Sequence, residues 1–215
     1  MLNLLRDRSE KYKCLSMCIL MFFTILGYNI MRGMKEAVLI NLPGSGAAYI
    51  PFVKLYVVLP ISFVFGLFYL QLRQKYGTFR TYYIITSIFL AYFFLFNFVI
   101  VPNTASLHPS EEWILSMQAA YPNIRFVFGV LGNWSGSLYY ASGELWGTFT
   151  LLILYWQIAN EMFNTEQAGR IYPILTFASS VAIYFASYVL DYLSSCSGAL
   201  HMSTLIVGSL GLLML

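Results

Sequence analysis

The chain has 215 residues, of which 59% are hydrophobic and 18% aromatic, and its mean hydropathy is +0.70. Only 10% of the residues are charged, whereas about 25% is usual for a soluble domain. The composition therefore excludes an ordinary soluble domain and predicts an integral membrane protein embedded in the lipid bilayer. The formal net charge is +3, and no basic stripe follows a path that a phosphate backbone could take, so nucleic acid is not an expected partner.

Apolar runs long enough to cross a bilayer as a helix, about 20 residues, recur along the chain. The predicted spans cover residues 14–31 with a helical continuation to residue 40, about 50–72, 82–101, about 134–159, about 171–190 and about 200–215. Residues 125–132 would make the fourth span too long for one crossing, so they are predicted to be an interfacial or re-entrant piece. The predicted fold class is all-α: a polytopic bundle of six transmembrane helices over residues 14–215, after a tail at residues 1–13.

Between the predicted spans, lysine and arginine lie in alternate segments, apart from Arg125 at the edge of one intervening connection. They lie in the tail, in residues 71–81 and in residues 160–170: Arg6, Arg8, Lys11, Lys13, Arg73, Lys75, Arg80 and Arg170. The intervening connections, 41–49, 102–124 and 191–199, contain neither residue type. Because cytoplasmic loops carry the excess of Lys and Arg, the N-terminal tail is predicted to be cytoplasmic. The first run has no small-x-small cleavage site after it, so it is predicted to be an uncleaved span rather than a signal peptide.

Charged residues within or beside these apolar runs are candidate functional residues: Arg32, Lys35, Glu36, Lys54 and Glu144. A charge at membrane depth costs on the order of 3 kcal/mol on insertion scales, and such residues usually face a bundle interior or a wet cavity. Arg32 and Lys35 are three residues apart and share a helix face, while Glu36 is four residues from Arg32 and can pair with it. Lys35 has no obvious partner nearby in the sequence.

Lys54 and Glu144 each allow a second interpretation. Lys54 lies about one turn inside its span and could extend its ammonium group outward to water. Glu144 could be a structural carboxylate held by a serine, tyrosine or cation of a neighbouring helix. From the helical rise, Lys35 lies roughly 9 Å and Glu144 roughly 15 Å inside the same outer surface, so one small polyanion could reach both. The excess of cations suits phosphate groups and predicts an anionic substrate.

Signatures of catalysis or metal binding are absent from the sequence. The glycines of "GSGAAYI" are not followed by GK[ST], and neither HExxH nor CxxC occurs. No nucleophile and base have a recognisable spacing. The sequence therefore does not predict an enzyme, a cofactor or a metal site.

Two segments resemble a known family. "NIMRGMKEAVLINLPGSGAAYIPFVKLYVVLP" (29–60) and "GELWGTFTLLILYWQIANEMFNTEQAGRIYPIL" (143–175) are similar to signature blocks of the non-mitochondrial nucleotide transporters, the ATP/ADP translocases of obligate intracellular bacteria, plastids and microsporidia. The link "LHPSEEWILSMQAAYPNIRF" (107–126) resembles the bacterial branch, and the resemblance covers almost the whole chain. Glu36 stands where the family usually has aspartate, and Gly143 where it usually has alanine.

The resemblance implies the N-terminal half of a major-facilitator-type bundle that exchanges external ATP for internal ADP. Lys35 and Glu144 correspond to charges that the family requires for function, and Arg32 and Lys54 match cations of its pattern. The hypothesis is that Lys35, Arg32 and Lys54 bind the phosphate groups of the nucleotide. Glu36 would hold Arg32 in place, and Glu144 would line or gate the path, with alternating access around the site.

The resemblance also implies partners and a location. Family members have about twice as many spans, so a missing C-terminal half or a second copy of the chain is expected to complete the carrier. The cytoplasmic membrane of an intracellular bacterium is the expected location, with a plastid envelope or a microsporidian membrane as alternatives. Two other functions stay open: a carrier of another nucleotide or phosphate-containing anion, and a truncated membrane subunit that does not transport.

Overall fold

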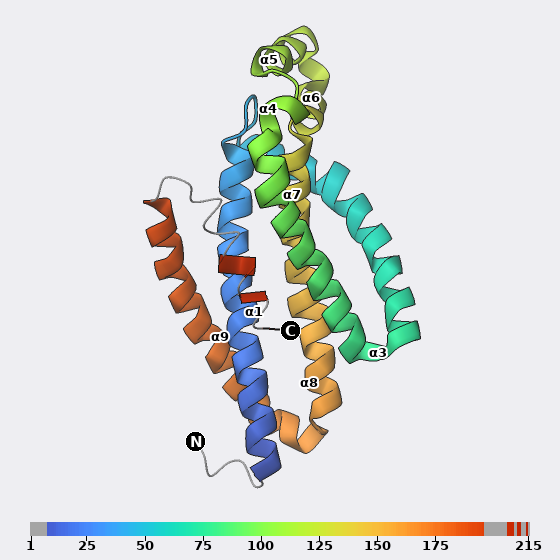
Figure 1. The fold of residues 1–215 in the computed structure, drawn as a ribbon, viewed down its shortest axis with the longest axis vertical. Helices are drawn as coiled ribbons and strands as arrows, with labels where there is room; N and C mark the ends of the chain where they lie inside the picture. Colours follow the sequence, from blue (N-terminus) through green and yellow to red (C-terminus); the bar gives the residue numbers. More distant parts are fainter. Residues whose placement is uncertain (1–7, 196–205, 209, 212–213, 215) are drawn as a thin grey trace.

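The computed structural model describes residues 8–195, 206–208, 210–211 and 214, and this part of the chain is helical almost throughout, without a β-strand (Figure 1). The α-helices are α1 (Arg8–Ile40), α2 (Ile50–Val53), α3 (Leu59–Leu95), α4 (Thr104–Leu107), α5 (Glu111–Ala120), α6 (Arg125–Gly132), α7 (Trp134–Leu145), α8 (Trp156–Met162) and α9 (Thr165–Ser194). Three π-helical segments continue the α-helices: η3 (Lys54–Val58), η4 (Phe96–Ile100) and η7 (Trp146–Tyr155). The all-α prediction is confirmed for the described residues.

Three helical segments of the described chain are long and apolar enough to cross a membrane: Arg8–Ile40, Ala47–Leu107 and Thr165–Ser194. The first confirms the predicted continuation to residue 40. The second is bent at Gly77, whose backbone angles are φ 74° and ψ 178°, a conformation that glycine adopts without the steric cost of a Cβ atom. The chain reverses direction there (Figure 1), between the regions predicted as the second and third spans.

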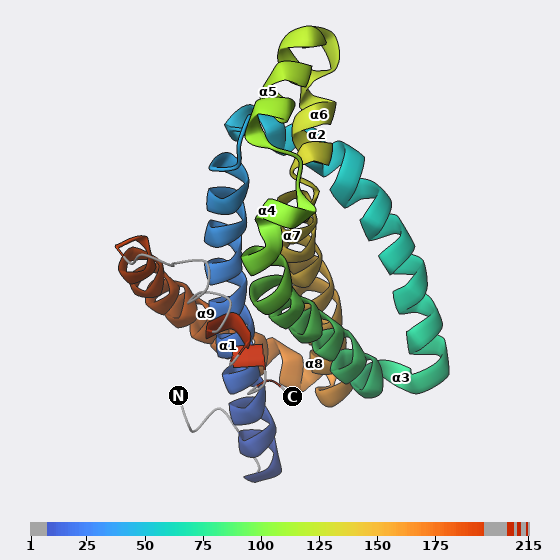
Figure 2. The same cartoon turned by 45° about the horizontal axis from the view of Figure 1, so that its top comes forward.

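The fourth predicted span corresponds to one helical run through α7, η7 and α8, at residues 134–162. Asn133, with φ −106° and ψ 43°, separates this run from α6, so residues 125–132 form a helix of their own; their interfacial or re-entrant position stays a prediction. The connection 102–124 differs from the expected loop, because it contains α4 and α5. Figures 1 and 2 show α5 and α6 together at one end of the bundle. The predicted sixth span lies largely outside the described residues.

Helix α1 packs along α9 and against α7 and η7. Glycines allow α1 to lie close to α7 and η7. A Cβ atom on Gly147 would lie 2.3 Å from the Tyr28 ring, and one on Gly143 would lie 2.9 Å from Cδ of Lys35. Small residues allow helix backbones to approach in this way. The close approach of α1 to α7 positions the charged side chains described below.

The cationic segments of the sequence gather at one end of the fold. The start of α1, the reversal at Gly77 and the junction of α8 with α9 all lie at the end opposite to α5 and α6 (Figure 1). There, Nη2 of Arg170 donates to Oε1 of the buried Glu10 at 3.1 Å, which ties α9 to α1. Residues 8–13, 71–81 and 160–170 therefore lie at one end of the described fold, and the side of the membrane that this end faces stays a prediction.

Candidate functional site

Lys35 and Glu144 meet in the interior of the bundle, where α1 crosses α7. Nζ of Lys35 lies 2.8 Å from Oε1 of Glu144, and the two side chains are 3% and 28% exposed. Lys35 had no predicted partner, because Glu144 is far away in sequence. The structure brings together the two charges that the sequence singled out most strongly.

Lys54 approaches the same carboxylate from a third element. It opens the π-helical segment η3, and its Nζ lies 3.4 Å from Oε1 of Glu144. Its side chain is 52% exposed, so the lysine both reaches inward and stays accessible, instead of only extending to water. Lys35, Lys54 and Glu144, hereafter the charge cluster, thus combine two cations with one carboxylate.

Tyr140 completes the surroundings of Lys35. The ammonium nitrogen lies 4.9 Å from the centre of the Tyr140 ring, within the range of a cation–π interaction. The tyrosine is fully buried, and its hydroxyl has no hydrogen-bond partner among the described residues. Sequence reasoning missed this residue, although its position four residues before Glu144 places the two side chains on one helix face.

Arg32 and Glu36 do not form the predicted ion pair. The salt bridges of the described residues do not include one between them. Arg32 is exposed, Glu36 is half-buried and Lys35 is buried, so the expected common face of Arg32 and Lys35 is divided between the surface and the interior. The four-residue spacing permits the pair but does not require it, because the exposed Arg32 side chain and the half-buried Glu36 side chain can each turn away from the other.

A cavity of about 260 Å³ lies beside the charge cluster; its lining residues are Tyr28, Glu144, Gly147, Thr148, Leu151 and Leu152. It is smaller than most ligand pockets, which have volumes of about 300–1,000 Å³. Glu144 therefore borders both Lys35 and open space. The π-helical segment η7 begins two residues after Glu144, and such segments occur often at functional sites.

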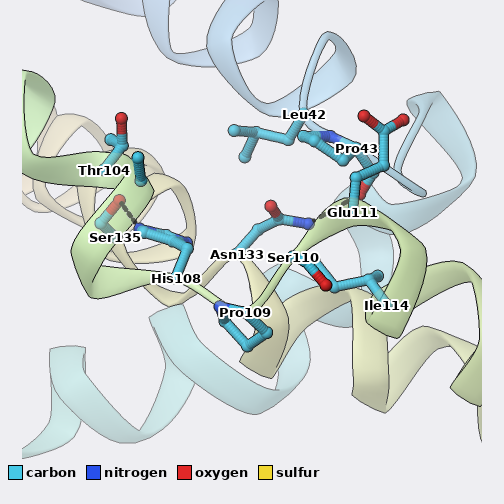
Figure 3. A pocket seen from close by; sticks show the side chains of 11 residues that line it. Leu42, Pro43, Thr104, His108, Pro109, Ser110, Glu111, Ile114, Asn133 and Ser135 are labelled. Atoms are coloured by element: carbon cyan, nitrogen blue, oxygen red, sulfur yellow. Dashed lines mark hydrogen bonds between the residues drawn. The ribbon is translucent and has the colours of Figure 1, made fainter.

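A larger cavity, about 510 Å³, lies at the end of the bundle that carries α5 (Figure 3). Its polar groups already bond one another: the ring nitrogens of His108 lie 2.9 Å from the carbonyl oxygen of Gly132 and 2.8 Å from Oγ of Ser135, and Asn133 donates to the carbonyl of Pro43 at 2.8 Å. These bonds hold together segments that are far apart in sequence, so the polar groups of this region have a structural role. In the described part of the chain, no group of three or more His, Cys, Asp or Glu side chains could hold a metal ion.

Charged residues in the interior of a multi-pass helical membrane protein are typical of substrate or ion pathways, and therefore of membrane transporters among other classes. Residues 7–211 match the model of the TLC ATP/ADP transporter family. The chain therefore belongs to this family, as the resemblance of the two sequence blocks indicated.

Proteins of Rickettsia are among its relatives. The chain is 37% identical to "ADP,ATP carrier protein 1" of Rickettsia bellii over 186 residues, which are 86% of this chain and 37% of the relative. It is 35% identical to the protein of that name from Rickettsia conorii over 201 residues, 94% of this chain and 39% of the relative. "ADP,ATP carrier protein 3" of R. bellii is 32% identical over 188 residues, 87% and 37% of the two chains. The chain thus spans less than two fifths of these relatives' length, and no solved structure matches it.

Proposed function

We propose that the chain forms part of a carrier that exchanges external ATP for internal ADP. In this proposal Lys35, Arg32 and Lys54 bind phosphate oxygens, and Glu144 and Glu36 line or gate the path. The observation that carries it is the charge cluster, because two ammonium groups converge there on one carboxylate oxygen, at 2.8 and 3.4 Å. The family membership and the names of the relatives support the choice of nucleotide.

Electrostatics favours an anion at this site. The charge cluster has one positive charge in excess, and exposed Arg32 lies one turn away on α1. Compact ammonium groups act as point-charge partners of phosphate, and the guanidinium group can bind two of its oxygens. A nucleotide with two or three phosphates would satisfy this excess, whereas a neutral or cationic solute would not.

The proposal includes a topology and a partner. We place the chain in a bacterial inner membrane as six spans of a major-facilitator-type bundle, with a cytoplasmic N-terminus. Arg32 and Lys54 are exposed on the described structure, and exposed charged groups are costly in lipid. A second half or a second copy of the chain would cover them and form the other wall of the site.

Reconstitution tests the proposal. Proteoliposomes loaded with ADP are expected to take up labelled ATP when residues 1–215 are combined with the C-terminal part of a full-length relative, and not when residues 1–215 are present alone. Unlabelled ATP and ADP should block the uptake, and simple organic acids should not. Block by inorganic phosphate or another nucleotide alone would identify a different anion. Saturable exchange by residues 1–215 alone would contradict the need for a second half, and no exchange in any combination would contradict the function.

A further inference from the structure

We infer that Glu144 is the resident counter-anion of the site. Its carboxylate occupies the place on Lys35 and Lys54 that phosphate oxygens take when the substrate binds, and Tyr140 is the positioning residue that keeps Lys35 in place when the carboxylate leaves. This inference rests on the proposed function and adds to it a competition between a side chain and the substrate.

The geometry of the charge cluster defines a place for one anionic oxygen. Both ammonium groups are directed at Oε1 of Glu144, at 2.8 Å from Lys35 and 3.4 Å from Lys54. An oxygen of a phosphate group at the same point would meet the same two cations at hydrogen-bonding distance from Lys35. The carboxylate and the phosphate group cannot both occupy this point, because they repel each other as like charges.

The exposure of the three side chains shows which of them can move. Lys35 is 3% exposed, Glu144 28% and Lys54 52%. Glu144 also lines the cavity of about 260 Å³, so its carboxylate can turn from the cations into space that already exists. Lys35 has less freedom than Glu144, because it is buried at 3% exposure and its Cδ atom lies close to the backbone of α7 at Gly143, which allows only small shifts.

Tyr140 stabilises the positive charge of Lys35 once the carboxylate has moved. Its fully buried ring, 4.9 Å from the ammonium nitrogen, attracts a cation through the negative face of the aromatic system. The ring makes the contact with Lys35, while the buried hydroxyl group lies near the carboxylate of Glu144. The aromatic ring is therefore predicted to matter for anion binding more than the hydroxyl group.

Competition has a measurable consequence, because coupling between two binding events is reciprocal. If Glu144 must release Lys35 before an anion binds, then removal of its charge should tighten anion binding. Pyrophosphate is a suitable probe, since it presents the phosphate groups without the nucleoside. The experiment measures its dissociation constant by calorimetry, at constant ionic strength, on residues 1–215 combined with the C-terminal part of a full-length relative in lipid nanodiscs.

We expect Glu144→Gln to bind pyrophosphate on the order of tenfold more tightly than wild type. Lys35→Gln should abolish binding, alone and together with Glu144→Gln. Glu112→Gln, the same change at an exposed carboxylate on α5, is the matched control and should bind as wild type. Tyr140→Phe should bind as wild type and Tyr140→Leu more weakly, since only the first keeps the ring; equal binding by both would overturn the role of Tyr140.

The outcomes separate this inference from the proposed function. If Glu144→Gln binds pyrophosphate as tightly as wild type or more weakly, and binding still depends on Lys35, then Glu144 is not a counter-anion. The phosphate-binding role of Lys35 would remain supported. Absence of binding in every protein, or binding that does not depend on Lys35, would overturn both. If Glu144→Gln does not fold, Glu144→Asp tests the inference instead, because the shorter side chain withdraws the carboxylate from the two lysines by one methylene group. Tighter pyrophosphate binding by Glu144→Asp would support the inference, and equal or weaker binding would overturn it.

Discussion

Two ion pairs tie α1 to other helices, and they differ in what surrounds them. Lys35 and Glu144 are 2.8 Å apart, with the cation buried at 3% exposure, whereas Arg170 and Glu10 are 3.1 Å apart, with the carboxylate buried at 4% exposure. The first pair has a second cation, an aromatic ring and a cavity beside it. In the described structure the second pair has a further carboxylate, Glu166, 3.8 Å from Arg170.

The comparison teaches that a buried ion pair does not by itself identify a binding site. Both pairs have similar distances and burial, and either would be costly to break from one side. What distinguishes the first pair is the second cation, the aromatic ring and the cavity beside it. Two cations next to a cavity suit a phosphate ligand, whereas the contact of Arg170 with Glu10 holds α9 against α1.

The largest expected difference between the two regions is in transport. In a carrier that contains this chain, Lys35→Gln should reduce ATP uptake to background with normal abundance in the membrane, because it removes the ammonium group without adding bulk. Lys35→Arg should also impair uptake, since a planar guanidinium group does not replace a compact ammonium group. Arg170→Gln should retain measurable uptake. Uptake in proteoliposomes, with abundance from immunoblots, checks this; wild-type uptake by Lys35→Gln would contradict the phosphate role.

The location of the second ion pair can be tested by labelling. The proposed topology places Glu10 and Arg170 at the cytoplasmic end and α5 at the outer end. In a variant without Cys14, Cys18 and Cys196, a cysteine at Ser110 should react with an impermeant thiol reagent added outside intact cells, and one at Gln74 should react only after the membrane is opened. Both positions are exposed, so burial does not explain a difference. The reverse pattern would invert the topology.

A smaller effect is expected from the contact that positions the charge cluster. Gly147→Ala should destabilise the protein by about 1–3 kcal/mol, because the new Cβ atom would lie 2.3 Å from the Tyr28 ring. Gly66→Ala is the matched control, since its Cβ atom would meet only Phe149, at 3.9 Å. Unfolding in denaturant, followed by tryptophan fluorescence, measures both. Equal stability of the two variants would show that α1 and α7 do not need this close approach.

The smallest effect is expected at Gly143. A Cβ atom there would lie 2.9 Å from Cδ of Lys35, part of a flexible side chain that can shift. Gly143→Ala should therefore change stability by less than about 1 kcal/mol and alter the KM for ATP a few-fold through the position of Lys35. Uptake kinetics at varied ATP concentration provide the test. An unchanged KM would show that the backbone at Gly143 does not set the position of the lysine.

The sequence predicted most of the elements, although the connection 102–124 contains two α-helices instead of a loop, and its errors at the site were of one kind. The apolar runs located α1, the two parts of the chain on either side of Gly77, the run from α7 to α8, and α9. The pairing of Glu36 with Arg32 was wrong, and Tyr140 was missed. Both misses concern side-chain contacts, because spacing along a helix shows which groups can meet but not which neighbours compete for them.

The sequence by itself determined that this is a helical membrane protein and which of its charges need an explanation. Hydropathy and the cost of a charge at membrane depth are local properties, so each can be read from a short segment. Only the tertiary structure decided that Lys35, on α1, and Lys54, on η3, share one oxygen of Glu144, on α7. The physical reason is the close packing of α1 against α7 at Gly143 and Gly147, since a distance of 2.8 Å between residues far apart in sequence depends on how the helices cross and not on the pattern of either helix.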